Sequence, residues 1–269
     1  RPDGTVSPTV TKDGSDDDEE LLLEEERALF SPFADLRKIR FLWYFESYMQ
    51  TIDAAEQTSS RSRTFERMPF ESVGNTMDGH FNYPELRKRL TFIRETIMHE
   101  TQTWAAEGLD FKKREMGIAV NLQRQYEQIV EDLKRQKNFT INLALVDENP
   151  FVWELTYFGR PMTHLDGGIF KINIHLSPRF PDEQPRVFMK TPLFHFRVSN
   201  HGVLCYSAQK CEEMRYHIEA IVMALQDENP PYDPRMTVNP EASKLYWGSA
   251  DDRKKYNRSL RRSVEKSVE

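Results

Sequence analysis

Two cysteines are the residues of this sequence with the clearest capacity for chemistry. Cys205 and Cys211 are the only thiols in 269 residues, which is too few for a disulfide framework and favours a reducing compartment. Cys205 follows Gly202-Val203-Leu204, a glycine and two apolar residues that can form a rigid stem leading out of a sheet. A thiol held in this way is a candidate nucleophile, whereas a cysteine in a core acts as a small hydrophobic group.

A metal site is the other chemistry that these thiols allow. His195, His201, Cys205 and Cys211 are residue types that bind zinc. Structural zinc sites usually pair their ligands about two to four residues apart within a turn. These four residues are not spaced in that way. The sequence therefore predicts no metal and no other cofactor, and Cys211 is interpreted as a surface or packing residue.

The chain that leads to Cys205 changes from helical to alternating periodicity. An amphipathic helix over 119–133 is followed by alternating apolar residues at 141–145, 153–157 and 170–176, and by a fourth short run at 187–189. Turn-forming residues separate these runs, as in an antiparallel meander. A buried helix at 218–225 and a final helix with a capping box at Ser249 and Asp252 come after the cysteines. The predicted fold class is α+β, with helices packed against one antiparallel sheet.

The part of the chain before this segment has a different composition. Residues 1–28 contain Pro, Gly, Thr, Ser and a run of acids, and are predicted to be a disordered acidic tail. Residues 29–108 are predicted to be a helical extension, with a loop over 58–79. Its second helix carries an apolar stripe with a proline near its start, at Pro84, Leu86, Leu90, Ile93 and Ile97. The remaining residues, 109–269, form the third predicted unit.

A series of short strings in this third unit follows a recognisable order. The strings are Trp153 to Gly159, Gly167-Gly168-Ile169-Phe170, Phe180-Pro181 with Pro185-Arg186-Val187, His195 ten residues before the cysteine of Gly202-Val203-Leu204-Cys205, Asn229-Pro230 with Asp233-Pro234 and Glu241-Ala242, and Arg253 to Asn257. Over about 115–269 they resemble the ubiquitin-conjugating enzyme (UBC) family. The resemblance implies a UBC-like fold with a four-stranded antiparallel meander sheet, flanking helices and a preceding helical segment. It also implies that Cys205 accepts ubiquitin or a ubiquitin-like protein as a thioester from an activating enzyme, and passes it to a lysine or a ligase.

The resemblance assigns roles to further residues, with one departure. His195 stands where the family's His-Pro-Asn begins, but Arg197 stands where that motif has its asparagine, which is associated with stabilising the oxyanion. Arg197 or Asn200 could supply the missing donor. Asp233 matches the family acid that orients and deprotonates the incoming lysine, although an aspartate in a proline-bounded turn also has a purely structural explanation.

The partners that the resemblance implies are also affected by departures. The loop after Cys205 is shorter than the family's and lacks its Trp-x-Pro, and Asp182 stands where many members have an apolar residue. Both positions belong to the surface on which members dock ligases, so we expect a dedicated ligase or an intrachain contact with the helical extension. Residues 79–86 and the aromatic helix 41–48 resemble the helical extension of the large Z-type conjugating enzymes. That extension follows a catalytic domain, so the order here favours a preceding UBC domain in a longer chain.

A non-enzymatic function is the rival hypothesis. A catalytically impaired UBC-fold variant could act as a ubiquitin-binding or scaffolding module. The missing asparagine and the short loop favour this rival, whereas Cys205 and Asp233 argue against it. The formal net charge of −6 argues against nucleic acid as the partner, and no apolar run is long enough to cross a membrane. We expect the protein in the cytoplasm, the nucleus or both.

Overall fold

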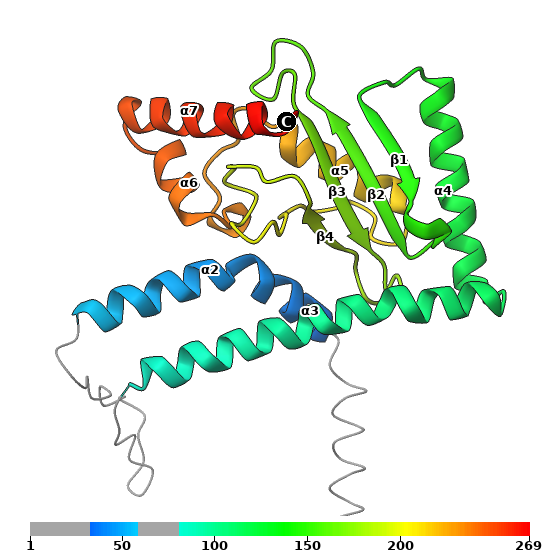
Figure 1. Cartoon of the computed structure of the whole chain (residues 1–269), viewed down its shortest axis with the longest axis horizontal. Helices are drawn as coiled ribbons and strands as arrows, with labels where there is room; N and C mark the ends of the chain where they lie inside the picture. The colour runs from blue at the N-terminus through cyan, green and yellow to red at the C-terminus, as the bar shows by residue number, and fades with distance from the viewer. Residues whose placement is uncertain (1–32, 59–80) are drawn as a thin grey trace, which may run out of the picture.

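The computed structural model describes residues 33–58 and 81–269, so the predicted acidic tail and nearly all of the predicted loop lie outside the described residues. Its elements, labelled in Figure 1, are α2 (Ala34–Thr58), α3 (Tyr83–Lys113), α4 (Gly117–Arg135), β1 (Ile141–Leu145), β2 (Val152–Phe158), β3 (Ile169–His175), β4 (Arg186–Met189), α5 (Met214–Gln226), α6 (Pro240–Tyr246) and α7 (Ala250–Lys266). Among the described helices, none has the length and apolar content needed to span a bilayer.

The predicted antiparallel meander is confirmed. The strands pair in the order β1-β2-β3-β4, and each neighbouring pair is antiparallel. One row of cross-strand partners runs through the sheet, from Leu143 to Leu155, Ile172 and Met189, and all four side chains are buried. Because side chains alternate between the two faces of a strand, this row fixes which face meets the helices.

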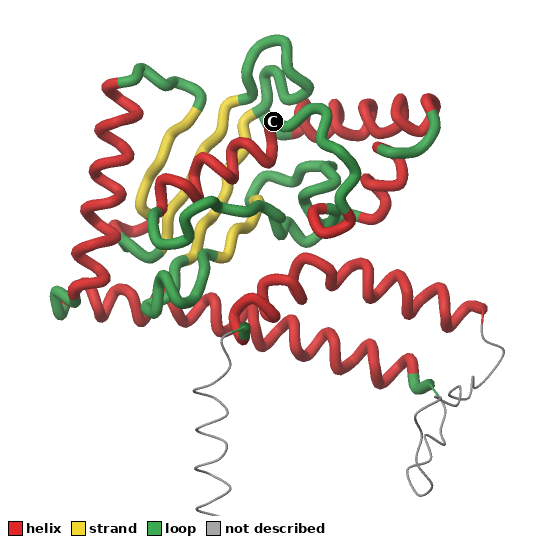
Figure 2. The backbone as a smooth tube through the Cα atoms, turned by 180° about the vertical axis from the view of Figure 1, so that it is seen from behind, coloured by secondary structure: helices red, strands yellow, loops and turns green. Residues whose placement is uncertain are grey.

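Helices cover one face of the sheet and lie at both of its ends. Helix α5 crosses the face of the sheet in Figure 2, and its buried residues Ile218, Ile221 and Leu225 join the same core as the central strands. Helix α4 lies beside β1, and α6 and α7 close the opposite end (Figure 1). The predicted capping box of the last helix is confirmed, since Ser249 and Asp252 each accept from the other's main-chain nitrogen.

Helix α3 crosses the predicted boundary between the helical extension and the third unit. The sequence places that boundary between residues 108 and 109, but α3 continues without a break to Lys113. The helix ends where Glu115 takes a φ of +52°, and α4 begins at Gly117. Lysine side chains in the last turn interact favourably with the helix dipole, which explains how this charged stretch stays helical. The domain boundary itself stays a prediction.

A buried charge network joins the α2–α3 hairpin to the sheet. The Arg186 side chain on β4 is only 1% exposed. Its Nη2 lies 2.9 Å from Oδ1 of Asp35 on α2, and its Nη1 donates to Oγ1 of Thr101 on α3 at 2.9 Å. The guanidinium also lies 4.4 Å from the centre of the Trp104 ring. The hairpin is therefore packed on the same body as the sheet (Figure 1).

The close packing of the turn after β2 can be tested with a glycine substitution. A Cβ at Gly159 would lie 1.7 Å from the carbonyl oxygen of Leu165, so Gly159→Ala must displace main chain. We expect the variant to lower the free energy of unfolding by about 1–3 kcal/mol. In Gly117→Ala, at the start of α4, the added Cβ meets no atom within 4 Å, and we expect no loss or a gain of up to about 1 kcal/mol. Urea unfolding measures both, and equal losses would contradict the prediction.

Candidate active site

Cys205 lies at the end of a segment that is pinned on both sides. The Met189 main-chain nitrogen on β4 donates to the Gly202 carbonyl at 2.7 Å, and Leu204 donates to Val187 at 3.2 Å. On the other side, the Cys205 nitrogen donates to the Arg197 carbonyl at 2.8 Å. Gly202 has a φ of +78°, and an added Cβ would lie 2.8 Å from the Met189 carbonyl oxygen, so this position needs glycine. The rigid stem expected before Cys205 is present.

The Cys205 thiol itself is enclosed. The residue is 0% exposed, and its Sγ lies 3.8 Å from the carbonyl oxygen of Arg235, to which the thiol can donate. Burial raises the pKa of the Cys205 thiol to about 12, while the positive charges of Arg197 and Arg40 oppose the increase. In this conformation the sulfur carries its proton.

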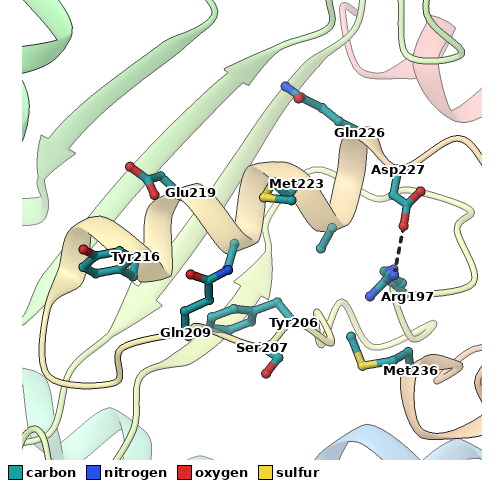
Figure 3. Close-up of a pocket in the computed structure, with 12 residues that line it drawn as sticks. Arg197, Tyr206, Ser207, Gln209, Tyr216, Glu219, Met223, Gln226, Asp227 and Met236 are labelled. Carbon is teal, nitrogen blue, oxygen red and sulfur yellow. Dashed lines mark hydrogen bonds and ion pairs between the residues drawn. The ribbon is translucent and has the colours of Figure 1, made fainter. Parts of the chain in front are cut away.

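Arg197 is hydrogen-bonded to Cys205 through the main chain, acts on the thiol with its charge, and has an unused side-chain donor. Its side chain is 11% exposed and its Nη2 lies 3.3 Å from Oδ2 of Asp227, just beyond α5 (Figure 3). Its Nε is buried and meets no hydrogen-bond partner within residues 33–58 and 81–269. Buried donors are nearly always paired, so an unpaired one beside a nucleophile calls for an explanation.

Asn200, the other predicted donor, is committed elsewhere. It lies in the turn just before the stem, where its main-chain nitrogen donates to Oε2 of Glu46 on α2 at 3.0 Å. Its Nδ2 donates to the other oxygen of the same carboxylate, and its Oδ1 accepts from Nδ2 of Asn239 at 3.3 Å. The structure therefore brings Arg197 to the thiol and ties Asn200 to a helix.

Asp233 lies in the electrostatic neighbourhood of the thiol, bonded to its own loop. Its carboxylate accepts from the Arg235 main-chain nitrogen at 2.9 Å and from Nη2 of the Arg235 side chain at 2.8 Å. These bonds lower the pKa of the Asp233 carboxyl, so it is ionised and a weak base. This arrangement suits orienting an amine better than removing its proton.

His195 is a supporting residue of the segment that precedes the thiol. The side chain is 0% exposed, and its ring stacks on the Phe196 ring with centroids 4.2 Å apart. Its Nδ1 accepts from the Arg197 main-chain nitrogen at 3.1 Å. Burial lowers the pKa of the His195 imidazole well below its usual value, so the ring is neutral. It holds the Arg197 main chain in place.

The remaining thiol and histidine of the metal hypothesis have other surroundings. Cys211 is exposed, and its carbonyl oxygen lies 3.0 Å from Nε2 of His217. The His201 ring lies against Phe45 of α2. Over the described ranges, no three His, Cys, Asp or Glu side chains are grouped so that they could hold a metal ion.

A groove of about 470 Å³ opens beside the thiol, between α5 and the chain that follows Cys205 (Figure 3). Its walls include Arg197, Tyr206, Met223, Asp227 and Met236. The sequence did not predict this groove, because its walls come from four separate parts of the chain. The contact of Tyr44 and Glu46 with the site was also missed, since no local pattern links a helix residue to a partner 154 residues away.

Because Cys205 is buried, we expect it to react slowly with alkylating reagents. In the native protein at about pH 8, we expect iodoacetamide to modify Cys211 and leave Cys205 intact, because the thiolate is the reacting form. The pKa of Cys205 is raised, so its thiolate fraction, and with it its alkylation rate in Cys211→Ser protein, should rise about tenfold per pH unit between about pH 8 and pH 10. Peptide mass spectrometry measures both rates. A plateau below about pH 9, or equal modification of both thiols, would count against an enclosed Cys205.

Comparison with known proteins identifies the family of the chain. The family model described as "Ubiquitin-conjugating enzyme" matches residues 121–264. "Ubiquitin-conjugating enzyme E2 2" of Neurospora crassa is 28% identical over 145 residues, which cover 52% of this chain and 94% of the relative. "Ubiquitin-conjugating enzyme E2 3" of Arabidopsis thaliana is 28% identical over 145 residues, covering 52% of this chain and 95% of the relative. The family match spans more than half of the chain, from α4 to α7, and the chain therefore belongs to the ubiquitin-conjugating enzyme family.

Proposed function

We propose that Cys205 accepts the C-terminal carboxyl group of ubiquitin or a ubiquitin-like protein as a thioester, delivered by an activating enzyme, and transfers it to a lysine or to a ligase. Family membership supports a transferase of the ubiquitin-conjugating kind. The observation that carries the choice of residue is the contrast between the two thiols. Cys205 ends the pinned stem beside Arg197, whereas Cys211 lies on an exposed turn.

Loading is an exchange between two thioesters. The Cys205 sulfur attacks the carbonyl carbon that the activating enzyme holds on its own cysteine, a new C–S bond forms, and the old C–S bond breaks. The proton of the Cys205 thiol ends on the departing thiol. The groove beside α5 supports this step, because its walls at Tyr206 and Met223 offer an extended peptide a binding surface in the neighbourhood of the thiol.

Discharge is attack by an amine on the thioester carbonyl. A C–N bond forms, negative charge develops on the carbonyl oxygen, and the C–S bond then breaks. The proton that the attacking nitrogen loses ends on the sulfur, which returns the Cys205 thiol. Arg197 supplies a positive charge and the free Nε–H donor for that oxygen. Asp233, held ionised by Arg235, attracts and orients the ammonium before it loses its proton.

A loading assay tests the proposal. The protein is incubated with activating enzyme, ATP and either ubiquitin or one of several ubiquitin-like modifiers, and is then run on a gel without reductant. We expect a shifted band that reductant removes, present in Cys211→Ser protein and absent in Cys205→Ala. In Cys205→Ser the hydroxyl should form an ester that resists thiols. A band that survives Cys205→Ala but is lost in Cys211→Ser would overturn the choice of residue.

The alternative is a UBC-fold module that binds ubiquitin without carrying it. The enclosed thiol and the absence of the His-Pro-Asn asparagine favour this alternative. It predicts no reductant-sensitive band with any modifier, together with ubiquitin binding that is unchanged in Cys205→Ala. The two outcomes separate a carrier from a scaffold in a single preparation.

A further inference from the structure

We propose that helix α2 is an intramolecular cover over the Cys205 thiol, and that it must move away before the thioester forms. The inference deepens the proposed function and rests on it for the consequence, although the cover can be tested without any modifier. The burial of the thiol conflicts with the chemistry proposed for it. A residue that exchanges thioesters between two proteins must meet a second protein, yet this thiol is 0% exposed.

The first contact of the cover is made through the carbonyl group that faces the sulfur. Tyr44 on α2 donates its hydroxyl hydrogen to the Arg235 carbonyl oxygen at 2.8 Å. The Cys205 Sγ lies 3.8 Å from that same oxygen. Arg40, one turn earlier on α2, is close enough to the thiol to influence it electrostatically, as is Tyr44. One face of α2 and the 233–236 loop thus meet over the sulfur.

The second set of contacts covers the stem that carries the thiol. Leu42 on α2 is 4% exposed and packs in one apolar cluster with Val203. Phe45 lies against the His201 ring, with centroids 5.8 Å apart. The Glu46 carboxylate accepts both hydrogen bonds that Asn200 donates. The stem is therefore held by β4 and the 195–198 segment and covered by α2 (Figure 1).

Helix α2 is anchored at both ends, away from the hydrogen bonds that cover the thiol. Its first turn is anchored by Asp35, which accepts from buried Arg186 and from the Gln184 main-chain nitrogen, each at 2.9 Å. Lys38 adds an ion pair with Glu100 of α3 at 2.8 Å. The far end of α2 is tied to α3 by Arg87, which pairs with Asp53 at 2.5 Å and with Glu56 at 2.8 Å. Between these anchors, roughly 14 Å from Asp35 along the helix, Tyr44 makes one hydrogen bond to the 233–236 loop, and Glu46 makes two to Asn200. These are the hydrogen bonds over the thiol that must break before a second protein reaches the sulfur.

The groove beside α5 does not provide another route to the sulfur. Its walls include Arg197, Tyr206 and Met236, and Cys205 is not among them. A modifier tail in that groove reaches the neighbourhood of the thiol but finds it enclosed by α2 and the 233–236 loop. Breaking the Tyr44–Arg235 hydrogen bond separates these two walls. That separation is the step that we place before loading.

Alkylation of Cys205 tests the cover directly. In a Cys211→Ser background at about pH 8, the rate of modification by N-ethylmaleimide is followed by intact mass. Tyr44→Phe removes the hydrogen bond to Arg235, and Glu46→Ala removes the acceptor of Asn200. We expect each to raise the rate about tenfold, which corresponds to about 1.4 kcal/mol in the opening equilibrium. Tyr48→Phe is the matched control on the same helix, 41% exposed, and should leave the rate unchanged.

Two results would overturn the cover, and a third would overturn its place before loading. The first is an equal rate in all four proteins, with thermal melts showing that all are folded. The second is acceleration by Asp233→Ala, which frees the loop alone, with none in Tyr44→Phe. The third is faster alkylation in Tyr44→Phe without faster loading by activating enzyme and ubiquitin. If no variant loads, the proposed function fails, but the alkylation rates still decide whether α2 covers the thiol.

Discussion

Replacing Arg186 with alanine is expected to lower the free energy of unfolding by about 3–5 kcal/mol. The guanidinium is almost wholly enclosed between β4, α2 and α3. It pairs at 2.9 Å with the Asp35 carboxylate, and the Asp35 side chain is 12% exposed. Removing the cation leaves that carboxylate in a poorly hydrated place without its partner, and Trp104 loses the group on its face. Breaking one side of a buried ion pair therefore destabilises far more than the pair itself contributes.

Urea unfolding followed by tryptophan fluorescence measures this loss. The matched control is Arg261→Ala on α7, where both members of the Arg261–Glu265 pair are about as exposed as ordinary surface side chains. We expect that control to change stability by less than about 1 kcal/mol. A double variant, Asp35→Leu with Arg186→Met, should lose less than the two single variants together, because no buried charge is left unpaired. Similar losses for Arg186→Ala and Arg261→Ala would contradict the prediction.

The parts of the fold that were predicted correctly are those with local signals. Alternation along Phe170, Ile172 and Ile174 reports directly which side of β3 is buried, since it depends only on the geometry of one strand. The capping box at Ser249 and Asp252 closes within one turn of helix. The end of α3 has a weaker local signal. The helix runs past the predicted domain boundary at 108 into the charged stretch, since lysine is a good helix former, and the break comes only at Glu115.

In the site, too, local signals were predictive and contacts between distant parts of the chain were not. Position in the family strings was enough to single out Cys205, Arg197 and Asp233 as candidates, because the strings are short and ordered, and their roles stay predictions. The enclosure of the thiol was not predicted, because it is made by partners that lie far apart in the chain. Tyr44 meets the Arg235 carbonyl across 191 residues, and Arg186 meets Asp35 across 151. In sequence α2 is an aromatic-rich helix, and only its docking shows which side chains face the sulfur.

Replacing Arg197 with alanine is expected to slow the transfer of ubiquitin from Cys205 to a lysine by about 10²–10³-fold. The Arg197 Nε–H is a buried donor with no partner within the described ranges, and the positive charge of Arg197 acts on the Cys205 thiol. Loading is measured beside discharge, in the gel assay, to separate the two steps. The rate is measured in single turnover, from preformed thioester, with free lysine in excess.

Three further variants identify what Arg197 supplies. Arg197→Lys keeps a positive charge but lacks the Nε–H, so an intermediate rate assigns part of the effect to the donor and part to the charge. Asn200→Ala should leave discharge near the wild-type rate, because the Asn200 amide already bonds Glu46 and Asn239. Arg261→Ala controls for the loss of a surface cation. If Asn200→Ala slows discharge as much as expected here for Arg197→Ala, and Arg197→Ala does not, then Asn200 is the donor. That result would require α2 to release Asn200 from Glu46 before transfer, so the cover would act on discharge as well as on loading.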